Sequence, residues 1–217
     1  MLTSEIRKIV KAIEKYRLKN VKFTVISNDC WGDDIYSAIN RPYNTPFVAL
    51  LIKPQAYLKL LKNLDHYLAS ELIFKENQDG VYPVGQLDNE IDIHFIHYET
   101  EQEAKEKWER RLLRFRNCIN KGATTIVKYA SQSDCSIEFL DEFHSLDYPR
   151  LLTIDTKSHS CFSNHISYSG LSVKESLDGL QLYKRRYKYF DFVHWIKKNE
   201  VKQTLVSKLI SLFILRV

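Results

Sequence analysis

The segment from Phe23 to Asp34 constrains the fold of this chain most strongly, because an apolar, largely β-branched run ends there in a short polar loop that opens a helix. A strand that leads through a loop into a helix is the repeating unit of α/β sheets, which bind ligands beside such loops. This loop brings hydroxyl, amide, carboxylate, thiol and indole groups into one short turn. We therefore predict a binding loop formed by Ser27, Asn28, Asp29, Cys30, Trp31 and Gly32.

Composition limits the class of protein. The chain has 217 residues, of which 44% are hydrophobic and 12% aromatic, with only 6 Gly and 5 Pro. These values predict a sizeable core and disfavour a loop-rich all-β protein or a long disordered region. The 4 cysteines lie far apart, without a Cys-x-x-Cys motif or zinc spacing, so we expect reduced thiols, a cytoplasmic location and no metal ligands. We see neither a signal-peptide core nor an apolar stretch of about 18 residues that would span a membrane.

Apolar periodicity predicts an alternating order of helices and strands. Helices are expected over 3–18, 32–40, 54–69, 101–118, 134–145, 187–199 and 201–215. Strands are expected over 22–27, 47–52, 71–75, 81–84, 90–98, 124–130 and 150–154, and a polar loop over 156–171. This order predicts a three-layer α/β/α fold with a mixed, mostly parallel sheet. We expect a single α/β domain over 1–199 and a basic amphipathic helix over 200–217, docked on the body or on a membrane surface.

Positive charge is concentrated at the two ends of the chain. Residues 1–22 carry seven Lys or Arg and two Glu, a net charge of +5, and residues 184–217 carry nine Lys or Arg and two acids, a net charge of +7. Because the whole chain has a net charge of +5, the remainder carries −7. The basic ends are either solvated helix faces or a surface for anionic lipid headgroups. The acidic middle disfavours nucleic acid, and no nucleic-acid motif is present.

Polar residues gather where the predicted strands end, at 27–29, 97–98 and 155–156. The carboxyl ends of parallel strands share one edge of a sheet, so we expect these three groups to lie together. His97 is our candidate general base, with Asp29 as the second choice, although a histidine at a strand end also serves structure alone. Asp92 and His94 share a strand face. Either the carboxylate orients the imidazole for a functional role, or the two form a buried structural pair.

Further binding residues are expected outside the loop, and we expect the segments near 28, 44 and 97 to converge on one hollow. Tyr43, Asn44 and Thr45 lie between two helix-breaking prolines, and Tyr98 follows His97. Lys107 and Arg111 belong to a helix rich in Glu–Lys pairs and are either solvated partners of Glu or cations that neutralise a phosphate. No glycine-rich nucleotide loop, nucleophile elbow or zinc-protease motif is present, so the sequence names no cofactor.

Three runs in the same order resemble a known bacterial family. They are Ile26-Ser-Asn-Asp-Cys-Trp-Gly32, Arg41-Pro-Tyr-Asn-Thr-Pro-Phe47, and His94-Phe-Ile-His-Tyr98 followed by Glu103-Ala-Lys-Glu-Lys-Trp-Glu-Arg-Arg111. The chain resembles the DUF1919 family, strongly over 22–115 and more loosely to about 198. The resemblance implies a three-layer α/β domain and a setting in exopolysaccharide or capsule loci. The family's usual loop, Asn-Asn-Cys-Trp-Gly-Gly, here contains Asp29 and Asp33, and these carboxylates argue against simple anion binding by the loop.

Two functions follow as hypotheses. The first is an enzyme of cell-surface polysaccharide biosynthesis, a glycosyl- or other group transferase that binds a nucleotide sugar or another phosphorylated small molecule. The second is a non-enzymatic adaptor that docks a polysaccharide assembly complex on the inner face of the membrane through its basic ends. Both place the protein in the cytoplasm, and the second makes it peripheral at an anionic inner membrane.

Overall fold

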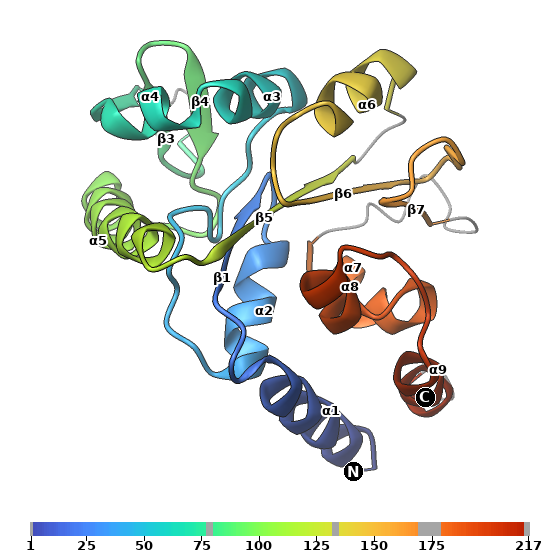
Figure 1. Cartoon of the computed structure of the whole chain (residues 1–217). Helices are drawn as coiled ribbons and strands as arrows, with labels where there is room; N and C mark the ends of the chain where they lie inside the picture. Colours follow the sequence, from blue (N-terminus) through green and yellow to red (C-terminus); the bar gives the residue numbers. More distant parts are fainter. Residues whose placement is uncertain (1, 77–79, 132–134, 169–178, 215–217) are drawn as a thin grey trace.

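A computed structural model of the chain describes residues 2–76, 80–131, 135–168 and 179–214, and all structural statements concern these residues. Helices and strands alternate through the first part, and helices close it (Figure 1). The elements are α1 (Leu2–Leu18), β1 (Phe23–Ser27), α2 (Trp31–Ile39), α3 (Pro54–Lys62), α4 (Leu64–Ala69), β2 (Leu72–Lys75), β3 (Val84–Leu87), β4 (Ile91–His94), α5 (Glu101–Asn120), β5 (Thr124–Ala130), α6 (Ile137–His144), β6 (Arg150–Asp155), β7 (His165–Ser167), α7 (Gly179–Tyr189), α8 (Phe192–Lys198) and α9 (Leu205–Ile214).

The centre of the fold is a parallel sheet in the order β1-β5-β6-β7. All five residues of β1 are buried, as expected of a strand covered on both faces. One core packs α1, α2, α7, α8 and α9 on one face, and a second packs α3, α4, α5 and α6 on the other. Figure 1 shows α3 and α6 above the sheet and α2, α7 and α8 below it. The predicted α/β class with helices on both faces is confirmed.

The antiparallel strands form a sheet of their own, in the order β2-β3-β4. A single bridge between Leu51 and His94 joins this sheet to the segment 47–52. The prediction of a strand at 47–52 is wrong, because this buried segment is irregular. The backbone of Leu51 bonds to His94, the amide of Ile52 bonds to the carbonyl of Asn28, and Ala49 has a φ of +61°. The segment divides its hydrogen bonds between two sheets, so it cannot form a continuous ladder with either.

Several predicted boundaries also need correction. The helix expected over 54–69 breaks at Asn63 into α3 and α4, and the second hairpin strand is β3 rather than 81–84. β4 ends at His94, since the chain turns at 96–97. The loop predicted over 156–171 contains β7, whose three residues give no apolar run, and its last three residues lie outside the described part. α7 begins before the helix expected at 187.

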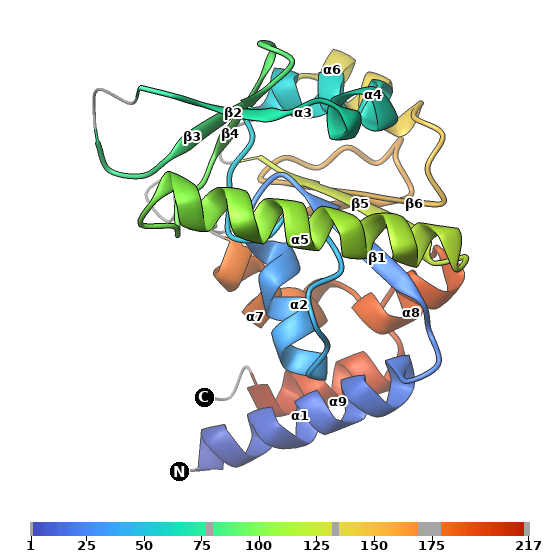
Figure 2. The same ribbon diagram turned by 90° about the vertical axis from the view of Figure 1, so that its left-hand side faces the viewer.

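The two basic ends of the chain pack together. The buried carboxylate of Glu14 in α1 accepts hydrogen bonds from Arg186 and Tyr187 of α7. Arg17 pairs with Asp191 at 2.7 Å. α9 contacts α1 and α7, and Figure 2 shows α9 beside α1. None of the helices in the described ranges is both long and apolar enough to cross a membrane.

Candidate functional site

The loop after β1 is tied to β5 by an amide. The side chain of Asn28 accepts a hydrogen bond from the backbone N–H of Ala130 and donates one to its carbonyl, both at 2.9 Å. This pair extends the β1–β5 ladder by one rung beyond Ser27, the last residue of β1. Asn28 therefore fixes where the loop leaves the sheet, which accounts for an amide at this position without a ligand.

Asp29 is held from three directions. Its Oδ2 lies 2.5 Å from Nζ of Lys128, and its Oδ1 accepts hydrogen bonds from Ser27 Oγ at 2.8 Å and from the amide of Trp31 at 3.0 Å. Burial lowers the pKa of Lys128, and the charge of Asp29 opposes that shift. A carboxylate with this many partners holds the loop and opens α2. In this geometry we assign Asp29 a positioning role.

The other predicted loop residues point inward or lie close to backbone. The indole of Trp31 is fully buried, with Nζ of Lys128 5.7 Å from its ring centroid. A Cβ at Gly32 would stand 3.4 Å from the carbonyl oxygen of Phe47, so α2 begins close to the backbone of the segment after Pro46. Cys30 is half-buried at the cap of α2. The loop is thus a packed junction.

The expectation that three strand ends share one edge is half correct. Because β1 and β6 both run parallel to β5, residues 27–29 and 155–156 do lie at the same edge of the sheet. There the buried Asp155 accepts the backbone N–H of Cys135 at 2.9 Å, and Nε2 of His159 lies 3.8 Å from it. His97 does not join this edge, since β4 belongs to the antiparallel sheet. Its side chain is exposed in the turn after β4.

Asn44 and Thr45 are also displaced from the predicted group. Asn44 donates to the carbonyl of Phe23 at 2.9 Å, and the Thr45 hydroxyl donates to the carbonyl of Val25 at 2.6 Å. These partners lie in the first half of β1, whereas Asn28 lies beyond its other end. The side chains of Asn28 and Asn44 therefore bond at opposite ends of β1 and do not converge as expected. The stretch after Arg41 runs along the open edge of β1, where side chains take the place of a neighbouring strand.

The predicted Asp92–His94 pair does not form either. Asp92 accepts from Gln86 at 2.9 Å and pairs with Lys75 at 2.6 Å. Both ring nitrogens of His94 are buried without a hydrogen bond in the described residues, and burial lowers the pKa of this histidine. His94 packs edge-on against Tyr82, with ring centroids 5.9 Å apart. Only the backbone of His94 takes part in the bridge to Leu51.

Four of the predicted binding residues do come together, between α5 and the start of α2. The guanidinium of Arg111 lies 4.9 Å from the ring centroid of Tyr43 and 6.0 Å from that of Tyr98, whose hydroxyl accepts its hydrogen bond. Nζ of Lys107 lies 5.2 Å from the ring centroid of Tyr98. The Tyr43 hydroxyl donates to Asp33 in the first turn of α2. We call Asp33, Tyr43, Tyr98, Lys107 and Arg111 the Arg111 cluster.

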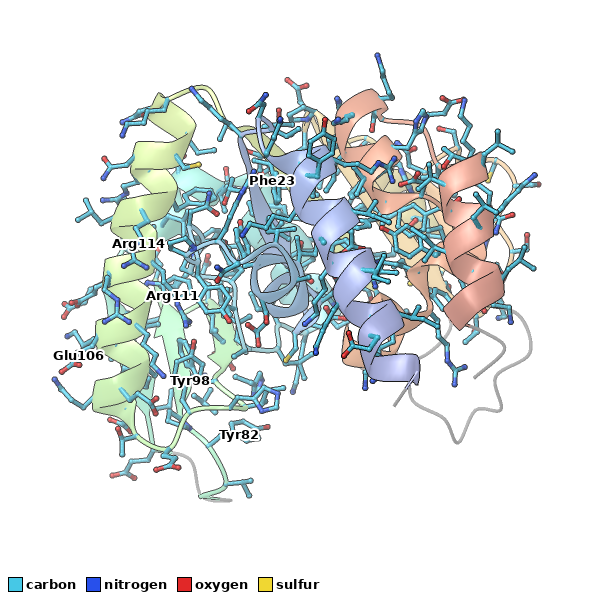
Figure 3. The ribbon with its side chains drawn as sticks, turned by 90° about the horizontal axis from the view of Figure 1, so that it is seen from below. Phe23, Tyr82, Tyr98, Glu106, Arg111 and Arg114 are labelled. Carbon is cyan, nitrogen blue, oxygen red and sulfur yellow. The ribbon has the colours of Figure 1, made fainter. Side chains whose placement is uncertain are left out.

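Arg111 is the unusual member of this cluster. The residue is only 7% exposed, yet in the described part of the chain its guanidinium forms no ion pair and makes one hydrogen bond, to the neutral phenol of Tyr98. Burial raises the pKa of Tyr98, and the positive charge of Arg111 opposes the rise. Figure 3 shows Arg111 and Tyr98 on the side of α5 toward α2, with Glu106 on the outer side.

Charges of both signs lie near the cluster, and the pKa of Glu103 is lowered by its bond to Lys107 and also by the charge of Arg111. Lys107 pairs with Glu103 one helical turn earlier, and Nη1 of Arg114 lies 3.4 Å from the carbonyl of Tyr43. An arginine presents a planar fork of donors that matches the oxygens of a phosphate, and aromatic faces hold such a fork in one plane. The Arg111 cluster therefore has the chemistry of an anion site rather than of a metal site. Among the described residues, no group of three His, Cys, Asp or Glu side chains is arranged to hold a metal ion.

Lys128 and the histidines near Asp155 were not predicted from the sequence. Lys128 lies between two buried residues of β5. A lysine in a strand would ordinarily point to solvent. The only sequence signal was this charge within an otherwise apolar and aromatic run. Thr153 lies 2.9 Å from ring nitrogens of both His144 and His165. That contact depends on the β6–β7 pairing, which was not predicted.

Comparison with known proteins shows the family of this chain. The model of a domain of unknown function, DUF1919, matches residues 1–197. An uncharacterized protein of Haemophilus influenzae is 30% identical over 184 residues, which cover 82% of this chain and 86% of the relative. Since the family model spans nearly the whole chain, the protein belongs to the DUF1919 family.

Proposed function

We propose that this protein binds a phosphorylated small molecule, of the nucleotide-sugar class, at the Arg111 cluster and transfers its sugar or another group during cell-surface polysaccharide biosynthesis. The single observation that carries the proposal is Arg111, a buried guanidinium with one hydrogen bond and no carboxylate partner among the described residues. The setting in polysaccharide biosynthesis comes from the resemblance of the sequence to proteins of exopolysaccharide and capsule loci.

Burying a cation costs free energy, because the charge loses its hydration. That cost is not recovered where the protein supplies no counter-ion. A phosphate beside Arg111 would supply both the charge and the oxygen acceptors. The rings of Tyr43 and Tyr98 both lie close to the guanidinium and restrict its position, so a phosphate would meet a donor group that is already held in place. Lys107 adds a second cation within reach of the same phenol.

His97 is the residue proposed to activate the acceptor, because its side chain is exposed. His97 is exposed and directly precedes Tyr98, so its imidazole is accessible to an acceptor hydroxyl near the cluster. Proton removal by such a base contributes roughly 10²- to 10⁴-fold to a rate. Asp29 is already engaged by Lys128, Ser27 and Trp31, and we assign it to loop positioning.

Ligand binding tests the proposal directly. Calorimetric titration with UDP-glucose, UDP, glucose 1-phosphate and glucose, with and without Mn²⁺, should show binding of phosphorylated compounds and none of glucose. Arg111→Met keeps an unbranched side chain, although a shorter one, and removes the charge, so it should weaken binding by at least about tenfold. Arg110→Met is the matched control, since Arg110 is the exposed neighbour on the same helix, and it should bind as the unchanged protein does.

Two results would count against the proposal. The first is the absence of binding by every phosphorylated compound. The second is equal affinity of the Arg111→Met and unchanged proteins, with both folded by circular dichroism. For the acceptor base, His97→Ala should lower turnover with a bound donor while leaving donor affinity unchanged, whereas the exposed His66→Ala should alter neither.

A further inference from the structure

The outward face of α9 carries an apolar stripe. Leu205, Leu209 and Leu212 are 80%, 57% and 57% exposed and recur at the spacing of one helix face. The opposite side of the helix faces the body, where Ser207 and Ile210 are buried. The exposed leucines therefore contribute little to holding α9 in place.

A basic face lies on the neighbouring helix. Lys8, Lys11 and Lys15 of α1 are exposed and share one side of the helix, and their only exposed acidic neighbour on α1 is Glu5, 2.8 Å from Lys8. The other acid of α1, Glu14, is buried against Arg186. Apolar side chains accompany the lysines, because Ile9 and Tyr16 are also exposed.

The fold joins these two faces into one end of the molecule. α1 and α9 lie side by side in Figure 2 and are in contact, although they come from opposite ends of the chain. The large apolar residues that the structure leaves exposed are concentrated there. Of the ten in the described residues, six lie on these two helices, namely Ile9, Tyr16, Leu205, Val206, Leu209 and Leu212. We call the exposed residues of α1 and α9 the terminal face.

We propose that the terminal face docks the protein on an anionic lipid membrane, with the leucine stripe entering the headgroup–acyl boundary and the lysines facing the lipid phosphates. The positive charge of the lysines complements the negative charge of anionic lipid, and this favours a membrane as the partner of the terminal face. An exposed apolar stripe beside a row of lysines is the composition of helices that lie in a membrane interface. In the described part of α9 no acidic side chain opposes the lipid. The proposal is independent of the nucleotide-sugar site and goes beyond it.

Vesicle flotation with the full chain is the test. The protein should float with vesicles of phosphatidylcholine mixed with phosphatidylglycerol and remain unbound with phosphatidylcholine alone. Binding to the mixed vesicles should weaken as salt is raised, because screening shortens the reach of the lysines. Replacing Leu205, Leu209 and Leu212 together by Ser should reduce binding by at least about tenfold.

Two sets of control variants separate the terminal face from general surface effects. Ile73, Val81 and Leu113 are equally exposed apolar residues elsewhere, and replacing them by Ser should leave binding unchanged. Lys8, Lys11 and Lys15 changed together to Glu should abolish binding to the anionic vesicles. The same charge change at the exposed residues Lys53, Arg110 and Lys121 should retain most of it.

Four outcomes would overturn the proposal. Three of them are equal binding to neutral and anionic vesicles, loss of binding only in the control variants, and absence of binding by the unchanged protein. The fourth is that the unchanged protein self-associates in lipid-free buffer whereas the leucine variant is a monomer. That result would make the stripe an interface between copies. Circular dichroism and thermal melting of each variant show whether a loss of binding reflects unfolding.

Discussion

Lys128 and Asp29 form an ion pair across the carboxyl edge of the parallel sheet, with 2.5 Å between Nζ and Oδ2 and no exposed surface on the lysine side chain. Their strands are neighbours, although the residues are 99 positions apart in sequence. The pair anchors the loop between β1 and α2, and that loop in turn places Asp33 against Tyr43. Local structure at the candidate site therefore depends on a contact made in the sheet.

Breaking this ion pair should destabilise the protein strongly. Lys128→Met leaves Asp29 buried without its cation and should lower the free energy of unfolding by about 3–5 kcal/mol, measured by urea titration. The double variant Asp29→Asn with Lys128→Met should lose less than the sum of the single variants, because the two residues act on each other. Lys62→Met is the control, since Lys62 and Glu142 are both 44% exposed, and should cost less than about 1 kcal/mol. Additive single effects would contradict a pair that acts as a unit.

Asn28 should prove structural. Asn28→Ala removes both partners of the Ala130 backbone groups and should cost about 2–3 kcal/mol of stability, because a buried donor and acceptor are left unpaired. Asn117→Ala, at an exposed position of α5, should have little effect. Chemical denaturation gives both values. A stable Asn28→Ala protein that loses ligand affinity would instead make Asn28 a binding residue.

Ala49 lies in the left-handed region, with a φ of +61°, where a Cβ is strained. Ala49→Gly should therefore raise the free energy of unfolding by up to about 1 kcal/mol, since relief of strain exceeds the entropy that glycine adds to the unfolded chain. Ala12→Gly, at an exposed position in α1, should lower it by about 1 kcal/mol. Equal destabilisation by both changes would show that the strain at Ala49 is absent.

Stability should fall as the pH drops from about 6.5 toward 4. Burial, reinforced by the neighbouring His165, lowers the pKa of His144 from its ordinary 6.5 to about 4. Between these values the unfolded chain binds a proton that the folded protein does not, so acid favours unfolding. Solvent reaches this half-buried ring, so we expect the free energy of unfolding to fall by only about 2 kcal/mol over this range. The fall levels off below pH 4.

A variant isolates the contribution of His144. His144→Gln should flatten the dependence of the unfolding free energy on pH over this range, as measured by urea titration at several pH values. Phe162 stacks on the His144 ring with centroids 4.6 Å apart, so Phe162→Leu disturbs the same contact but keeps the titrating group. It should lower stability at every pH and retain the slope. An unchanged slope in His144→Gln would assign the pH dependence to other groups.

Elements with strong local signals were predicted from the sequence. α5 follows the predicted 101–118 closely, because its Glu–Lys pairs and the Thr100 cap act within a few residues. β1 and β5 were recognised from their apolar runs. The segment 47–52 has the same apolar composition as a strand, but its hydrogen bonds go to partners that the local sequence does not specify. β7 was missed for the converse reason, since three residues carry too little pattern.

At the candidate site, too, only part of the predicted grouping is found. The sequence named Tyr43, Tyr98, Lys107 and Arg111 as binding residues, and the structure brings them together. It also grouped them with Asn28 and Asn44, which face opposite ends of β1. Asn44 lies apart because its side chain bonds to the start of β1, and His97 lies apart because β4 belongs to the antiparallel sheet.

The sequence by itself determined the class of fold, the loop after β1, the family and the chemical types available for binding, because periodicity, short motifs and composition are local properties of a chain. Only the tertiary structure decided that Lys128 is buried against Asp29, that Arg111 has no carboxylate partner among the described residues, and that both basic ends meet at the terminal face. Those three facts depend on strand order and helix packing. Both are set by contacts between residues far apart in sequence, for which no single segment carries a signal.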